Sequence, residues 1–175
     1  MANCMYCKAE ISEGSTFCPH CGKKQVQIYT RTFRRENMSE AQFIEQINQW
    51  FAMYPQVANV KGRFLSNSKF GLMVNKYTLD AFSIEYELFN SANENQYAVV
   101  ALSTTTLVKT STDRLLNNWK QANPGAQVLA RDGGVHQCGN RGSLVMGGIG
   151  AVNKTQLYVF FKFNRSKGPA ALPNP

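Results

Sequence analysis

The chain has 175 residues, of which 43% are apolar, and its formal net charge is +8. This length suits one ordinary domain with a small appendage, and the apolar content argues against a disordered chain. The chain contains no run of 18 apolar residues, which excludes a membrane-spanning helix, and no signal-peptide-like stretch is expected at its start.

Four of the five cysteines lie in the first 21 residues, as two C-x2-C pairs separated by ten residues. The pairs are Cys4 with Cys7 and Cys18 with Cys21. This spacing predicts one structural Zn2+, because each pair forms a tight turn that directs two thiolates at the same ion. Four thiolates fill the tetrahedral shell and leave no position for a catalytic water. Thiolates that are free to bind zinc imply a reducing compartment, and we therefore expect a cytoplasmic protein.

The same cysteines could instead form disulfides or a redox pair. A reducing compartment disfavours disulfides, and a redox C-x-x-C normally occurs singly within an α/β fold of a different pattern. We therefore prefer the metal site. A ribbon of this size is too short to bury a core of its own, so it is expected to be unfolded or nearly so without metal.

The sequence Phe17-Cys18-Pro19-His20-Cys21-Gly22 resembles the second knuckle of the short N-terminal zinc-ribbon families. The resemblance covers about residues 3–25 and implies a metal site, not an activity. Lys8 departs from the family pattern, which often has a glycine after the first pair. His20 lies between two ligands and is expected to be exposed rather than bound to the ion.

The organisation expected along the chain has four parts. A zinc ribbon spans residues 1–25, with a hairpin over 8–15 that has Gly14 in its turn, and a linker follows over 26–30. An α+β domain with a mainly antiparallel sheet and two amphipathic helices spans residues 31–165. A proline-containing tail over 166–175 is expected to be disordered.

Two helices carry the clearest local signals of the large domain. Ser39 begins the first, with Gln42 completing a capping box, and Pro55 ends it just beyond Tyr54. The second is predicted over 111–122. The two helices and the sheet are expected to share a core formed by Ile44, Ile47, Trp50, Phe82, Ile84, Leu115, Trp119 and Phe161.

The strands are predicted from alternation and from apolar runs. Residues 81–89 alternate between apolar and polar, which predicts a sheet with one wet side, whereas 157–163 is apolar on both faces and is expected to be central. A meander of four antiparallel strands, with turns at 66–68 and 91–95, is the simplest connection. The other predicted strands are 32–35, 57–65, 70–77, 97–103 and 127–131.

A glycine-rich segment follows, with seven of the thirteen glycines between Gly133 and Gly150. It could cradle a phosphate, but neither common phosphate-loop spacing is present, and turns or bulges explain the same residues. His136 and Cys138 could form a nucleophile with its base, although no third group stands at a recognisable spacing to orient them. An enzyme with a site in this segment is the third functional hypothesis.

The densest basic group lies within 13 residues around the end of the ribbon. Basic residues interleaved with Phe33 can hold a nucleic-acid backbone and stack a base, but arginines on an edge strand also discourage aggregation. The leading hypothesis is a zinc-binding, non-enzymatic adaptor with a macromolecular partner, protein rather than nucleic acid, and the alternative is nucleic-acid binding. The candidate residues for that alternative are Lys23, Lys24, Arg31, Arg34 and Arg35.

Overall fold

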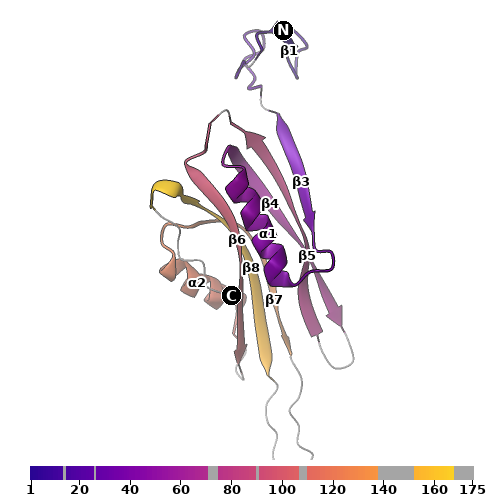
Figure 1. Cartoon of the computed structure of the whole chain (residues 1–175), viewed down its shortest axis with the longest axis vertical. Coiled ribbons are helices and arrows are strands. Elements are labelled where there is room, and N and C mark those ends of the chain that lie inside the picture. The colour runs from indigo at the N-terminus through magenta and orange to yellow at the C-terminus, as the bar shows by residue number, and fades with distance from the viewer. Residues whose placement is uncertain are drawn as a thin grey trace, which may run out of the picture.

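The computed structural model describes residues 1–13, 15–25, 27–70, 75–89, 91–106, 110–137 and 152–167. It confirms an α+β fold with mostly antiparallel sheets and a four-cysteine cluster at the N-terminus (Figure 1). No helix within these ranges is long and apolar enough to cross a membrane. The elements in chain order are β1 (Ala2–Asn3), β2 (Glu10–Ile11), β3 (Ile28–Arg34), α1 (Glu40–Met53), β4 (Val57–Phe70), β5 (Asn75–Leu88), β6 (Asn95–Thr106), α2 (Thr112–Ala122), β7 (Gln127–Gln137), β8 (Asn153–Asn164) and a short 3-10 helix (Arg165–Lys167).

The large domain has two three-stranded antiparallel sheets, of order β3-β5-β4 and β6-β8-β7. β4 of the first sheet lies against β7 of the second (Figure 1). The predicted meander is therefore only partly correct: β4 and β5 pair as neighbours, but β6, the next strand along the chain, belongs to the second sheet and pairs with β8. β8 occupies the central position that was expected for residues 157–163.

The turn predicted at 66–68 is also wrong. β4 continues through it to Phe70, and β5 is one strand where two were predicted. The polar residues are part of the ladder: Ser66 pairs with Leu79, after a register shift, and Asn67 pairs with Thr78. The polar residues predicted a turn here, but their polar groups have partners within the sheets. The hydroxyl of Thr78 donates to the carbonyl of Asn67, and the hydroxyl of Ser66 bonds to side chains of neighbouring strands.

Two other strands are longer than predicted. β3 begins at Ile28, within the expected linker, and β7 runs to Gln137 because Gly133 and Gly134 pair with β8. A Cβ at Gly133 would lie 2.3 Å from the carbonyl oxygen of Gln156, so only glycine permits this approach of the two strands. Of the predicted tail, residues 166 and 167 lie in the 3-10 helix, and the rest lies outside the described residues.

Both helices begin as predicted. The Ser39 hydroxyl accepts from the Gln42 N–H at 3.2 Å, and the Ser39 N–H donates to the Gln42 side chain at 2.9 Å, which completes the capping box. The Ser111 hydroxyl caps α2 by accepting from the Arg114 N–H. These bonds satisfy N–H groups that have no partner within the helix.

The helices cover opposite faces of the second sheet. α1 packs on one face together with Tyr158 and Phe160 of β8, in a core that also includes side chains of β3, β4 and β5. α2 packs through Leu116 and Trp119 on the other face, against the alternate residues of β8. The core prediction is confirmed for Ile47, Trp50, Phe82, Ile84, Trp119 and Phe161, whereas Ile44 and Leu115 are half-buried.

One side chain of α1 protects the edge of β6. The Asn48 amide donates to the carbonyl of Val99 at 3.0 Å and accepts from its N–H at 2.7 Å, as a neighbouring strand would. Asn48→Ala should therefore lower the free energy of unfolding by about 1–3 kcal/mol, because both backbone groups lose their partner. The urea midpoint measures this loss, and light scattering should show association through the opened edge. Gln49→Ala, on the exposed face of α1, should leave both readouts unchanged.

Candidate metal centre

Each cysteine pair lies in the turn of its own small hairpin. β1 pairs with β2 around Cys4 and Cys7, and a bridge between Phe17 and Lys24 encloses the second pair. Among the described residues, strand pairing therefore encloses the two cysteine turns, whereas the hairpin was predicted across residues 8–15. Gly14, its predicted turn residue, lies outside the described residues. The two turns repeat one pattern, with Lys8 N–H donating to the Cys4 carbonyl and Gly22 N–H donating to the Cys18 carbonyl.

The four sulfur atoms converge on one point. All of them lie within 4.8 Å of one another, with Cys4 and Cys21 3.7 Å apart and Cys7 and Cys18 3.6 Å apart. Cys4 and Cys18 are buried, and Cys7 and Cys21 are at the surface. This cluster could hold one metal ion.

Backbone N–H groups point at the two buried sulfur atoms. The N–H groups of Tyr6 and Cys7 donate to Cys4 Sγ, both at 3.4 Å, and the N–H of His20 donates to Cys18 Sγ at 3.3 Å. Such bonds favour the thiolate form, which is the form that binds metal. His20 is exposed and contributes its backbone N–H to the site.

The pKa values of the first pair move apart when no cation is present. Burial raises the pKa of Cys4, but the N–H groups of Cys7 and Tyr6, with the neighbouring thiols, lower it to about 6. The N–H of Ala9 lowers the pKa of Cys7, whereas the shared proton with Cys4 and burial raise it to about 12. Cys4 and Cys7 therefore do not both ionise readily by themselves, and a bound cation would remove the repulsion between their thiolates.

The residue after each pair has a left-handed backbone, with φ of 62° at Lys8 and 69° at Gly22. This conformation costs a residue with a Cβ about 1–2 kcal/mol, so Lys8 strains the first turn. Lys8→Gly should tighten metal binding by about fivefold or more, and Gly22→Ala should weaken it similarly. Competition with a chromophoric chelator measures both, and weaker binding by Lys8→Gly would contradict the prediction.

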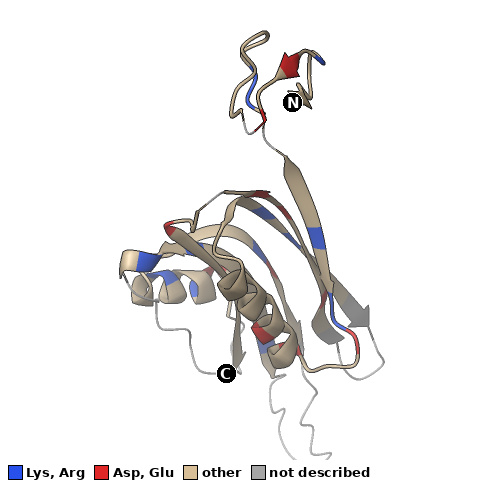
Figure 2. Cartoon of the chain, turned by 45° about the horizontal axis from the view of Figure 1, so that its top comes forward, with Lys and Arg blue, Asp and Glu red and all other residues tan. Residues whose placement is uncertain are grey.

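The five basic residues that are close in sequence are dispersed in the structure. Lys23 lies 4.7 Å from the centre of the Tyr6 ring, and Lys24 pairs with Glu87 at 3.7 Å. Arg35 pairs with Asp80 at 3.7 Å. In Figure 2, the basic residues are spread over the ribbon, the sheets and α2, with acidic residues between them.

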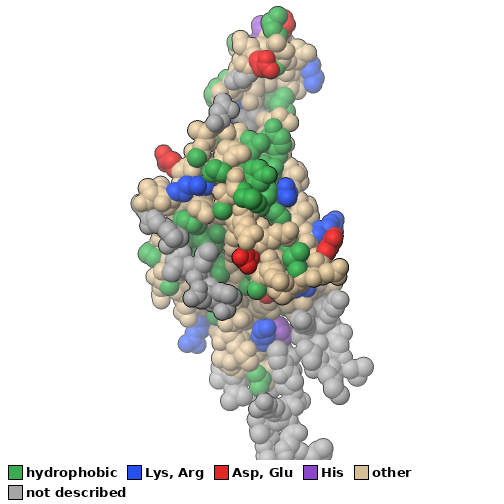
Figure 3. Space-filling model, viewed as in Figure 1, with side chains coloured by type: hydrophobic (Ala, Val, Ile, Leu, Met, Phe, Trp, Pro, Cys, Tyr) green, Lys and Arg blue, Asp and Glu red, His purple; other side chains and the backbone are tan. Residues whose placement is uncertain are grey.

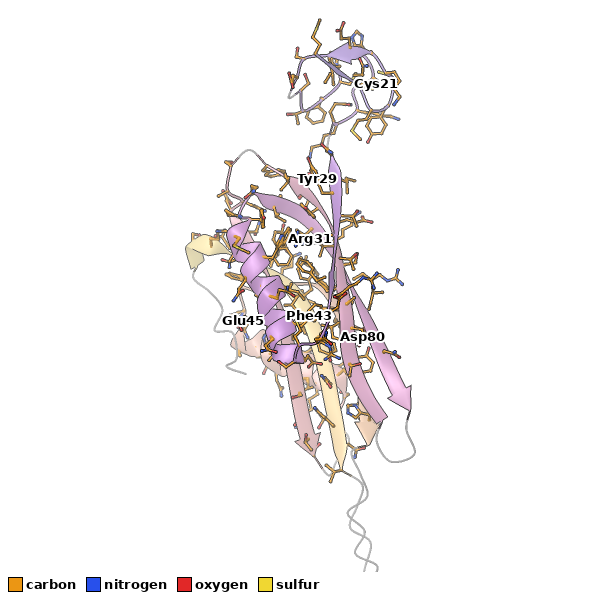
Figure 4. All side chains as sticks on the ribbon, turned by 45° about the vertical axis from the view of Figure 1, so that its right-hand side comes forward. Cys21, Tyr29, Arg31, Phe43, Glu45 and Asp80 are labelled. Carbon is orange, nitrogen blue, oxygen red and sulfur yellow. The ribbon has the colours of Figure 1, made fainter. Side chains whose placement is uncertain are left out.

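The other two arginines lie on opposite faces of β3, because side chains alternate along a strand. The guanidinium of Arg31 lies 5.0 Å from the ring centres of both Phe33 and Trp50, on the side of α1 (Figure 4). Arg34 is exposed on the other face. The structure therefore does not gather the five residues into one basic patch.

The glycine-rich segment is described only in part. Gly133, Gly134 and His136 lie in β7, whereas Cys138 and the rest of the segment to residue 150 lie outside the described residues. The Nδ1 atom of His136 is buried and has no hydrogen-bond partner among the described residues. Burial, and then Lys154, lower the pKa of His136, which favours the neutral imidazole.

Two polar clusters that no sequence pattern indicated lie on the face of the sheets toward α1. The hydroxyls of Ser66 and Tyr77 both donate to Asp132 of β7, the latter at 2.5 Å. Burial, and then Asp132, raise the pKa of Tyr77 to about 12. These bonds join the two sheets where β4 meets β7.

The second cluster joins α1 to β8. Glu40, in the first turn of α1, accepts from the hydroxyl of Tyr158 at 2.5 Å and from the amide of Gln156 at 2.7 Å. Burial, and then Glu40, raise the pKa of Tyr158. The partners are more than a hundred residues apart, and no local sequence signal could have paired them. Both clusters satisfy their own hydrogen bonds and hold the elements together.

Comparison with known proteins gives no family for this chain: no protein-family model matches the sequence, and no curated protein or solved structure matches it significantly.

Proposed function

We propose that the four cysteines hold one structural Zn2+. Zinc–sulfur bonds of about 2.3 Å in a tetrahedron place sulfur atoms about 3.8 Å apart, close to the 3.6 and 3.7 Å separations of the two contacts across the pairs. Four thiolates suit zinc and complete its shell, so the ion would fix the ribbon and would not activate a water. Free thiolates would require a reducing compartment such as the cytoplasm.

We further propose that the protein is a non-enzymatic adaptor whose ribbon contacts a protein partner. The observation that supports this role is the exposure of three large apolar side chains: Met5 is 53%, Tyr6 is 54% and Phe17 is 59% exposed. The ribbon's own buried cluster contains only Cys4, Ile11 and Cys18. Exposed apolar groups on a rigid, metal-fixed unit are typical of a protein contact surface.

A nucleic-acid partner is the alternative. The dispersal of the basic residues makes it less favoured than a protein partner. Two of the five candidate cations already pair with carboxylates, those of Glu87 and Asp80. An enzyme is the third hypothesis, and the described part of the 133–150 segment offers it only the half-buried His136. We therefore assign no catalytic residue.

The test replaces the three exposed apolar side chains together, in the variant M5S/Y6S/F17S. Its zinc content should equal that of the wild type, since the backbone N–H groups that face the sulfur atoms remain. Proteins that crosslink to the full wild-type chain in its native cells should not crosslink to the variant. Each of them should bind the purified wild type at least tenfold more tightly than the purified variant. Leu65→Ser, which removes an exposed apolar side chain from β4, is the control.

Fluorescence anisotropy with single- and double-stranded DNA and RNA, starting at low salt, tests the alternative that the protein binds nucleic acid. Each phosphate contact contributes about 0.7–0.9 to the slope of log affinity against log salt, so a true interface gives a steep slope. Binding that is lost in the variant R31A/R34A/R35A would favour nucleic acid. Partners that are unchanged in the ribbon variant would reject the adaptor role of the ribbon.

A further inference from the structure

The two sheets of the large domain have four edge strands, and three of them are covered. β4 and β7 lie against each other, joined by the hydrogen bond from Ser66 to Asp132. β6 is covered by α1, whose Asn48 pairs with Val99. β3 pairs only with β5, and no other described element pairs with its outer edge.

The outer edge of β3 has the features of a template for another strand. Five of its seven residues are exposed, and it contains the β-favouring residues Ile28, Thr30 and Thr32. Its register with β5 runs from Ile28 to Arg34 without a bulge, and the strand contains no proline. Proteins usually blunt such an edge with a proline, a bulge or a cover, and β3 has only its arginines.

These two arginines indicate what kind of strand would fit. Arg31 faces Ile84 across the pair with β5, and Arg34 faces Ala81, so β5 places no carboxylate directly opposite either one. No acidic residue occurs between Ile28 and Arg35. The carboxylates of β5 are engaged or displaced. Glu87 binds Lys24 and Asn59, and Asp80, next to Ala81, pairs with Arg35. Glu85 pairs in register with Thr30 and Lys61.

An aromatic surface lies beside the same edge. Tyr29 of β3 stacks on Tyr86 of β5 at 5.6 Å, and Trp50 contacts Tyr86, Tyr54 and Arg31. In Figure 3, hydrophobic side chains gather on this face of the large domain, below the ribbon. Figure 4 shows Tyr29 and Arg31 along β3 next to this surface.

We propose that β3 binds an extended acidic peptide of a partner protein by strand addition. Main-chain hydrogen bonds to the open edge would supply affinity, and cross-strand pairing would supply specificity. Carboxylates opposite Arg31 and Arg34 stand three positions apart and lie on opposite faces of the sheet. An apolar residue opposite Phe33 would contact the aromatic surface. The site belongs to the large domain and does not depend on the role proposed for the ribbon.

The experiment selects ligands from a displayed library of random dodecapeptides, using the full zinc-loaded chain as bait. Selected peptides should share two acidic residues three positions apart with an apolar residue between them, and should lack a central proline. Binding of a selected peptide should weaken at least tenfold in Arg34→Glu and be unchanged in Arg63→Glu, which reverses an exposed charge on β4. A peptide whose acids are changed to lysine should recover binding to Arg34→Glu.

Hydrogen exchange locates the bound strand, since the amides of residues 28–34 should exchange more slowly when the peptide is present. The ribbon variant M5S/Y6S/F17S should bind the peptide like the wild type, so this site can fail or succeed independently of the ribbon surface. The proposal is overturned if no peptide is enriched, if Arg34→Glu binds as tightly as the wild type, or if sedimentation shows that a second copy already covers the edge. Protection of these amides by nucleic acid alone would also overturn it.

Discussion

Chelation of the bound metal should unfold residues 1–25 and leave the α+β domain folded. The ribbon has its own small cluster of Cys4, Ile11 and Cys18, and a unit of this size would not be stable without a bound ion. The two core clusters of the large domain contain no residue before Phe33. Metal binding to such sites supplies on the order of 10–16 kcal/mol, so the ribbon should lose its structure completely.

Elemental analysis should give one zinc per chain in protein purified under reducing, chelator-free conditions. After chelation, the amide resonances of the ribbon should collapse to unfolded positions, whereas the tertiary signals of Trp50 and Trp119 should persist. Readdition of Zn2+ should restore the ribbon. A metal content near zero would reject the site, and loss of the tryptophan signals would mean that the two parts fold together.

Signals that act over a few residues were predicted correctly from the sequence. The two serine caps, at Ser39 and Ser111, each need only a partner three residues away. The cysteine turns are equally local, because each places two cysteines within four residues. The alternation in residues 81–89 also gave the correct faces of β5, with Phe82 and Ile84 in the core.

The remaining errors involve partners that are distant in sequence. Ser66 lies in a polar run that is typical of a turn, but its partner Asp132 is 66 residues away and belongs to the second sheet. Gly133 and Gly134 lie beyond the strand predicted at 127–131, in a segment whose composition indicated turns, bulges or a phosphate cradle, although the close approach of β8 requires Gly133 in a strand. Local patterns contain no information about these pairings, which depend on the packing of the two sheets.

The candidate functional residues show the same limit. Proximity in sequence suggested that the five basic residues would act together, but alternation along β3 places Arg31 and Arg34 on opposite faces. Asp80 and Glu87, from β5, then pair with Arg35 and Lys24. β3 is left with two arginines that have no carboxylate of β5 opposite them, a property that depends on the register of the pair and not on the local sequence.

Gly62 should be the least tolerant position in the first sheet. It lies on β4 opposite Ile84, and a Cβ there would lie 2.6 Å from Phe160 Cδ1 and 2.8 Å from Phe82 Cζ. Both rings are fully buried and contact each other with their centres 5.1 Å apart. A close-packed interior cannot move either ring away without displacing its neighbours, so the added methyl group must strain the core.

Gly62→Ala should therefore lower the free energy of unfolding by about 2–3 kcal/mol, and Gly62→Val by more. Urea denaturation followed by tryptophan fluorescence measures the change, with the slope of the transition unchanged if the folded state stays compact. Gly125→Ala is the matched control, because no atom lies within 4 Å of a Cβ at that position in the turn after α2. Equal midpoints for the two alanine variants would show that the rings of Phe82 and Phe160 do not pack against β4 as the structure places them.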